Sequence, residues 1–299
     1  MSGRPGFWRR LAHQRSASVG FAIFATILLA SLCAGLFAPA SPERINLDAA
    51  LESPSIHHPF GTDPFGRDVL SRIVYGARIS LGVGFLARTI SIVLGLFLGS
   101  LAGYFGGRLD SILMRLADIT FAYPTLLLLI AVIAVVSPGM VSLFMTLGVV
   151  GWASVARLVR AQVLSVKERE FVQAARASGA GHASIIFKHI LPQCLAPVFV
   201  VYTLGLGMTI MAESSLSFLG LGVQPPEPSW GGMISSGIAF MRTAPWLTFF
   251  PGLFLTLTVC SLNLIGDALR DALSPRMGGD VAKPVACGAL EPVASEGSR

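Results

Sequence analysis

Two ionisable side chains stand inside otherwise apolar stretches of the sequence, where a charge is costly and usually serves a function. Glu213 lies in the stretch 195–219, and Arg88 lies in the stretch 81–101. A carboxylate or a guanidinium inside a helical bundle can line a polar translocation path, and both residues are candidates for one. For Glu213 the alternative is a structural hydrogen bond to a neighbouring helix. Arg88 could instead extend toward the membrane surface or pair with another group.

The sequence lacks the motifs of common hydrolytic sites. A G-x-x-x-x-G-K-[ST] phosphate loop is excluded because none of the three lysines (Lys167, Lys188 and Lys283) follows a glycine. H-E-x-x-H and G-x-S-x-G are absent too. His57 and His58 are adjacent rather than four residues apart, so they do not indicate a metal site. We therefore expect no catalytic residue, metal or cofactor in this chain, which is not predicted to be an enzyme.

Six apolar stretches must position these side chains. The chain has 299 residues, of which 53% are hydrophobic and only 13% are charged. Each stretch is 17 to 25 residues long, and about 20 helical residues cross the apolar core of a bilayer. A helix also satisfies its own backbone where water is absent. We predict an all-α membrane protein with six transmembrane helices near residues 19–37, 81–101, 119–136, 140–156, 195–219 and 246–265.

Proline and glycine positions refine this prediction. Pro124 and Pro251 each remove a backbone donor and favour a kink in the third and sixth spans. Gly95, Gly99 and Gly103 share one helical face and predict the close approach of another helix, within the subunit rather than between subunits. The first apolar stretch exceeds the length of a signal-peptide core, so we expect an uncleaved anchor.

The placement of basic residues predicts the orientation of the helices. With a cytoplasmic N-terminus, 16 of the 22 lysines and arginines lie in inside segments and 5 lie in outside segments. Both termini are therefore expected in the cytoplasm, as a short basic tail (1–18) and a disordered tail (276–299). The net charge of +6 reflects this orientation and attraction to anionic lipids. It does not indicate nucleic-acid binding.

The longest inside segment between spans, residues 157–194, contains the passage EFVQAARASGAGHASIIFKHILP at 170–192. Residues 167–178 have helical composition, and Gly179 is expected to end that helix. A second helical segment is expected from Ser184 to Ile190, before Pro192. Phe171, Ala174, Ala175 and Ser178 fall on one helical face. This small-residue face could dock into the cleft of a partner, or the segment could be a surface connector without a partner.

This passage resembles the cytoplasmic loop motif of ATP-binding cassette (ABC) importer permeases, E-A-A, three residues, G, nine residues, I-x-L-P. Ala174, Ala175, Gly179, Leu191 and Pro192 match it, while Gln173 replaces the glutamate and His189 replaces the isoleucine. Four further stretches resemble signatures of the dipeptide, oligopeptide and nickel permease group: 60–81, 102–124, 216–234 and 250–276. Within that group, the chain is similar to the second, shorter permease subunit over residues 18–277, as one transmembrane permease domain (19–275).

The resemblance implies a type I ABC importer permease fold in a bacterial inner membrane. It assigns ATPase coupling to Gln173, Ala174, Ala175, Arg176, Gly179, Ala180 and Gly181, with Leu191 and Pro192 directing the chain into the fifth span. The implied partners are a homologous permease subunit, two ATPase subunits that bind ATP and magnesium, and a periplasmic or extracellular substrate-binding protein. Transport would then proceed by alternating access, driven by the ATPase subunits.

The substrate and the energy source leave alternatives. Peptides (dipeptides or oligopeptides) are the expected substrate, because most of the resemblance is to peptide permeases. Nickel and glutathione are alternatives within the same family. Outside the family, the chain could be an ion-coupled secondary transporter with Glu213 as the coupled carboxylate, or a membrane scaffold without a transport role.

Overall fold

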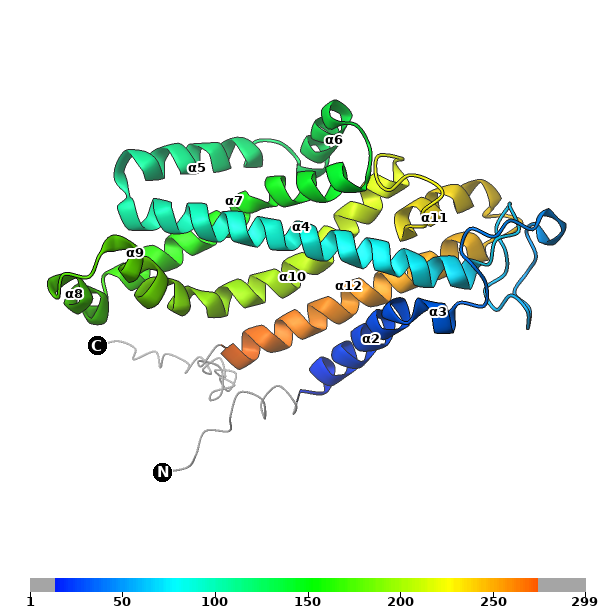
Figure 1. Cartoon of the computed structure of the whole chain (residues 1–299), viewed down its shortest axis with the longest axis horizontal. Helices are drawn as coiled ribbons and strands as arrows, with labels where there is room; N and C mark the ends of the chain where they lie inside the picture. The colour runs from blue at the N-terminus through cyan, green and yellow to red at the C-terminus, as the bar shows by residue number, and fades with distance from the viewer. Residues whose placement is uncertain (1–13, 274–299) are drawn as a thin grey trace, which may run out of the picture.

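The computed structural model describes residues 14–273, and helices make up nearly all of the regular structure there. Most of the 1–18 tail and the whole 276–299 tail lie outside the described residues. Five helices are long and apolar enough to cross a membrane: α2 (Arg15–Leu32), α4 (Val69–Phe105), α7 (Met140–Lys167), α12 (Trp246–Leu273) and the continuous helical stretch from His182 to Phe218, which includes α10 (Leu191–Phe218). They run side by side along the long axis (Figure 1).

The third span along the chain is a bent pair of helices. α5 (Gly107–Phe121) and α6 (Thr125–Val136) meet at an angle of 95°. Pro124 begins the second helix and disfavours helical backbone at Tyr123, so the predicted kink in this span takes the form of a break. α5 lies alongside α4, and α6 turns across the bundle (Figure 1). The predicted range 119–136 thus covers α6 and the last three residues of α5.

Charges on α5 and α7 explain why these helices extend beyond the predicted spans. Asp110 of α5 accepts two hydrogen bonds from Arg160 of α7, one of them 2.6 Å from Nη2. Asp118 accepts one hydrogen bond, from Nη2 of Arg157. These four residues made 102–118 and the start of 157–194 read as loops, but paired charges are accommodated in helices. Residues 157–167 belong to α7, so the predicted loop 157–194 is shorter than expected.

The second span also begins earlier than predicted, at Val69 instead of Leu81. Asp68 caps α4 by accepting a hydrogen bond from the backbone N–H of Ser71 at 2.7 Å. Arg72 and Arg78 in the first turns donate to backbone carbonyls of Pro42, Ser31 and Leu32. The hydropathy pattern does not identify these turns as helix because they contain polar residues. Those residues are accommodated in the helix because they hydrogen-bond to other parts of the protein.

The close packing of α4 against α7 forms the centre of the bundle. A Cβ atom added to Gly103 would lie 2.8 Å from the Cβ of Val163, and atoms added at Gly95 and Gly99 would clash with Val155 and Ala156. The predicted glycine face thus packs within the subunit. Shorter differences occur elsewhere: α2 ends at Leu32 and is followed by α3 (Ala34–Phe37), while α12 continues eight residues past the predicted end.

The two ends of the bundle carry different short elements. At one end lie α8 (Glu170–Ala177), α9 (His182–Ser184) and the π-helical turn η2 (Ile185–Ile190). At the other lie residues 38–68, including the short helix η1 (Leu47–Ala49), and α11 (Trp230–Gly237), which η3 (Ile238–Phe240) follows (Figure 1). The side chain of Trp230 is fully buried and donates to the carbonyl of Ile73, which ties α11 to α4.

Candidate functional site: an exposed loop and a cavity in the bundle

Residues 168–184, the α8 loop, project from the end of α7 as a short helix followed by a defined turn. The N–H of Gly179 donates to the carbonyl of Arg176 at 3.0 Å, and the N–H of Ala180 donates to that of Ala175 at 3.1 Å. This pair of bonds is a Schellman motif, which requires a left-handed residue after the helix. Gly179 supplies it with φ +80°. The predicted end of the helix at Gly179 is therefore confirmed.

One side chain anchors α8 to the bundle, and the rest of its surface is open. Val172 is 0% exposed and packs in a cluster with Val163, Val166 and Ile185. The predicted face (Phe171, Ala174, Ala175 and Ser178) points away from that cluster, with Ala175 half-buried and the other three exposed. Gln173, Arg176, Gly179 and Gly181 are exposed as well, and Ala180 is half-buried. The predicted coupling residues thus form one accessible surface over a fixed anchor.

Contacts to α4 hold the α8 loop from the other side. The hydroxyl of Tyr104 and Nδ1 of His182 lie 2.8 Å apart, and Lys167 donates to the carbonyl of Gly103 at 3.1 Å. A displacement of α8 would therefore move α4, α7 and α10 together. Tyr104 and His182 are 78 positions apart, and no spacing in the sequence could pair them.

Leu191 and Pro192 begin α10 as part of a continuous helical stretch. Pro192 has no N–H to donate one turn back, and the turn immediately before α10 is the π-helix η2. A looser turn at this point connects the α8 loop to the fifth span without interrupting the helix. The sequence-based expectation that these two residues direct the chain into the span fits this geometry.

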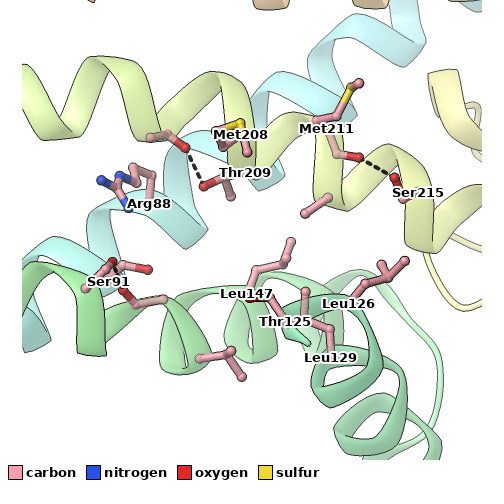
Figure 2. A pocket seen from close by; sticks show the side chains of 15 residues that line it. Arg88, Ser91, Thr125, Leu126, Leu129, Leu147, Met208, Thr209, Met211 and Ser215 are labelled. Carbon is pink, nitrogen blue, oxygen red and sulfur yellow. Dashed lines mark hydrogen bonds between the residues drawn. The ribbon is translucent and has the colours of Figure 1, made fainter. Parts of the chain in front are cut away.

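A cavity of about 510 Å³ opens between α4, α6, α7 and α10. Figure 2 shows its walls, with Arg88 and Ser91 at one side, Leu126 and Leu147 below, and Met208, Met211 and Ser215 along α10. The volume lies in the usual range of small-molecule sites. Most of the wall is aliphatic or methionine side chain, with a few hydroxyl groups and one cation.

Arg88 is that cation, and its side chain is 7% exposed. One terminal nitrogen donates to the carbonyl of Val201, but Nε has no hydrogen-bond partner among the described residues. No carboxylate in residues 14–273 forms an ion pair with it. The guanidinium lies flat against Gly205, where a Cβ atom would collide with it. A buried charged group therefore borders the cavity, with no counter-ion among the described residues.

Glu213 belongs to α10, the helix against which Arg88 of α4 packs, but its environment is different. Its side chain is 0% exposed, and it does not line the cavity. Ser217 donates to Oε1 at 2.8 Å and Ser214 donates to Oε2 at 3.1 Å, and Ser80 of α4 lies beside the same carboxylate. These partners favour a structural role for Glu213. The two candidates for a polar path are thus not brought together.

The opposite end of the molecule is built around Asp63. Its carboxylate accepts from Nε of Arg67 at 2.6 Å and from the backbone N–H groups of Phe65 and Arg67 at 2.9 Å. His58 contacts the helix cap Asp68 at 3.0 Å. Within residues 14–273, no three His, Cys, Asp or Glu side chains gather closely enough to hold a metal ion. These bonds give the 38–68 loop a fixed shape.

Residues 95–279 match the family of binding-protein-dependent transport system inner membrane components, and residues 6–54 match the N-terminal transmembrane domain of oligopeptide transport permease C. A dipeptide transport system permease protein of Alkalihalophilus pseudofirmus is 44% identical over 90% of this chain and 89% of its own length. A glutathione transport system permease protein of Pectobacterium atrosepticum is 41% identical over 91% and 90%.

Solved structures support the fold. The MetNI methionine ABC transporter, described as inward facing, aligns with a TM-score of 0.52 and 20% identity, over 68% of this chain and 96% of that one. An amino acid ABC transporter aligns with a TM-score of 0.50 over 67% and 94%. The chain is a multi-pass membrane protein with the fold of ABC importer permeases, and it belongs to the family of binding-protein-dependent transport system inner membrane components.

Proposed function

We propose that this chain is one of two permease subunits of an ABC importer that moves short peptides across the bacterial inner membrane. Separate ATPase subunits bind ATP and magnesium, and a substrate-binding protein delivers the peptide to the end formed by residues 38–68 and α11. The relatives named for dipeptide, oligopeptide and di/tripeptide transport support the substrate class. Glutathione is the second candidate because of the relative in Pectobacterium.

The observation that carries this proposal is the α8 loop. α8 offers an exposed small-residue face to a partner, while Val172 and the Tyr104–His182 contact fix it to the long helices. An ATPase subunit that grips α8 would rotate those helices when its nucleotide site closes. Energy applied at one end of the bundle would then open and close the cavity in its middle, as alternating access requires.

The test is ATP-dependent peptide uptake by the complete complex in proteoliposomes, with the partner permease, the ATPase subunits and the binding protein. Ala174→Glu places a charge on the exposed face of α8 without altering its turn. We expect uptake and peptide-stimulated ATP hydrolysis to fall at least tenfold, because a desolvated, unpaired charge opposes docking. Gly179→Asp is a poorer probe, since φ +80° would strain the turn itself.

Ser165→Glu is the matched control, because Ser165 is exposed on α7 outside the α8 loop. It adds the same charge and should leave uptake within about twofold of the wild type. Uptake driven by an ion gradient without ATPase subunits would instead favour a secondary transporter. Normal coupling in Ala174→Glu would remove the α8 loop from the mechanism.

A further inference from the structure

The guanidinium of Arg88 has unused donor capacity at a place where it can meet a ligand. It carries five N–H donors, and a single acceptor, the carbonyl of Val201, is its hydrogen-bond partner within the described residues. A buried charge without a counter-ion is costly, so such charges in a membrane domain are normally paired. The side chain lines the cavity between α4, α6, α7 and α10. The partner it lacks can therefore arrive through the cavity.

Three other hydroxyl groups of the cavity wall are available as acceptors. The hydroxyls of Thr209, Ser215 and Ser154 donate their protons to the backbone carbonyls of Gly205, Met211 and Gly151. Their oxygen lone pairs are left for N–H groups of a ligand. Ser215 lies at the opposite side of the cavity from Arg88 (Figure 2). A ligand that carries an anion at one end and N–H groups along its length matches this order.

The wall also sets a length scale. Arg88 packs against Gly205 of α10. Ser215 lies ten residues after Gly205 in α10, which corresponds to a rise of about 15 Å along the helix. An extended peptide spans about 3.3–3.6 Å per residue, so two to about four residues fit along this wall. Met208 and Met211, which are flexible and largely exposed, can adapt to different side chains.

We propose that Arg88 binds the C-terminal carboxylate of the transported peptide during its passage through the membrane, an inference that rests on the proposed function. The planar guanidinium can bind a carboxylate through two parallel hydrogen bonds. Every peptide with a free C-terminus presents that group, whatever its side chains. Recognition at this position would therefore be independent of peptide sequence.

This assignment separates the substrates that the family allows. A cation at the cavity wall repels free Ni²⁺, whereas peptides and glutathione carry carboxylates. The carbonyl of Val201 also favours release of the peptide, because it accepts a hydrogen bond from the guanidinium once the carboxylate has left. A transport path needs binding that is favourable but brief. The partly paired Arg88 meets that requirement better than a fully unpaired charge would.

The first experiment measures uptake of dialanine by the reconstituted complex with Arg88→Gln, Arg88→Lys and, as a matched control, Arg115→Gln. Arg115 is an exposed residue of α5 that does not line the cavity. We expect kcat/KM to fall about ten- to hundredfold in Arg88→Gln, as for loss of a charged hydrogen-bond partner. Arg88→Lys should lose less, since it keeps the charge but not the fork. Arg115→Gln should stay within about twofold.

A second measurement isolates the carboxylate. Equilibrium binding of tritiated dialanine and of its C-terminal amide is measured on the permease–ATPase complex without the binding protein, whose own selectivity would otherwise interfere. The wild type should bind the acid at least tenfold more tightly than the amide, and Arg88→Gln should bind both equally. Equal binding of acid and amide to the wild type, an unchanged preference in Arg88→Gln, or no saturable binding would overturn the proposal.

The failures of the two proposals differ in their signatures. If the wild-type complex shows no ATP-dependent uptake of any peptide, the proposed function is wrong. If it imports peptides and Arg88→Gln imports them equally well, only the role of Arg88 is wrong. ATP-dependent uptake of Ni²⁺ but of no peptide would leave the importer mechanism in place and overturn both the peptide substrate and the carboxylate site.

Discussion

Glu213 and Arg88 are both ionisable side chains inside the bundle, but their hydrogen bonding and their position relative to the cavity differ. Glu213 has no exposed surface, and two serine hydroxyls donate to its carboxylate. Arg88 borders a cavity, donates to one backbone carbonyl and leaves Nε without a partner in residues 14–273. Both side chains involve α10: Glu213 belongs to this helix, and Arg88 of α4 packs against its Gly205.

This difference shows how satisfied and unsatisfied polar groups separate architecture from function. A buried group with hydrogen-bond partners is part of the packing, and here Ser214 and Ser217 bond the carboxylate of Glu213 within α10, beside Ser80 of α4. A buried group with free donors has a cost that the fold itself does not recover. Glu213 should therefore affect stability, and Arg88 should affect transport.

The largest expected effect on stability is that of Glu213→Ala. It removes the acceptor of two serine hydroxyls in a site with no exposed surface. We expect the free energy of unfolding to fall by about 1–3 kcal/mol, measured as thermal unfolding of the purified complex in detergent. Glu213→Gln retains a carbonyl acceptor and should lose less. Uptake per inserted complex should stay close to that of the wild type.

The comparison would break if Glu213→Gln unfolded like the wild type but no longer transported. In that case the carboxylate, and not its hydrogen bonds, would be the important feature, and the serine-lined site would be part of the path. Such a result would also revive the ion-coupled carboxylate considered for Glu213.

A smaller effect on stability is expected from Gly205→Ala, which tests the packing of the Arg88 guanidinium against α10. The added Cβ would collide with Arg88 and push its end away from Val201. Because a flexible side chain can yield, we expect less than about 1 kcal/mol of lost stability but a several-fold loss of peptide uptake. Gly207→Ala is the matched control, since its Cβ would meet its nearest neighbours at 3.5 Å or more.

A double substitution shows whether the two residues act together. In an Arg88→Gln background, Gly205→Ala should cause little further loss of uptake, since the guanidinium it displaces is already gone. Additive losses would mean that Gly205 serves another purpose, such as packing between α4 and α10.

The sequence predicted the helices better than their ends, and the reason is visible at particular residues. Apolar stretches located every membrane-crossing segment, but the ends of α4, α5 and α7 contain charges. Arg157 and Arg160 pair with Asp118 and Asp110 across α5 and α7. A hydropathy pattern counts each of these as a loop residue, because it has no information about its partner. For the bent third span, Pro124 was the one residue in the sequence that indicated a kink.

The site was predictable where its signal is local. Gly179 ends α8 because the turn needs a left-handed residue, and glycine at that spacing could be recognised in the sequence. The contact between Tyr104 and His182 joins residues 78 positions apart, and the cavity gathers its lining from four helices. Arg88 and Glu213 looked alike in the sequence because both interrupt apolar stretches. Only the packing of serines around one of them distinguishes the two.

The smallest effects should come from single hydroxyl groups, and they sharpen the comparison most closely. Ser217→Ala removes one hydrogen bond to Glu213 and should cost about 0.5–1.5 kcal/mol of stability with unchanged uptake. Thr209→Val removes a cavity hydroxyl whose proton goes to a helix carbonyl, so stability should change by less than about 0.5 kcal/mol. Its lost lone pairs should still lower peptide uptake about twofold. If Thr209→Val changed stability alone, the Thr209 hydroxyl would be structural and would not serve as a contact for the peptide.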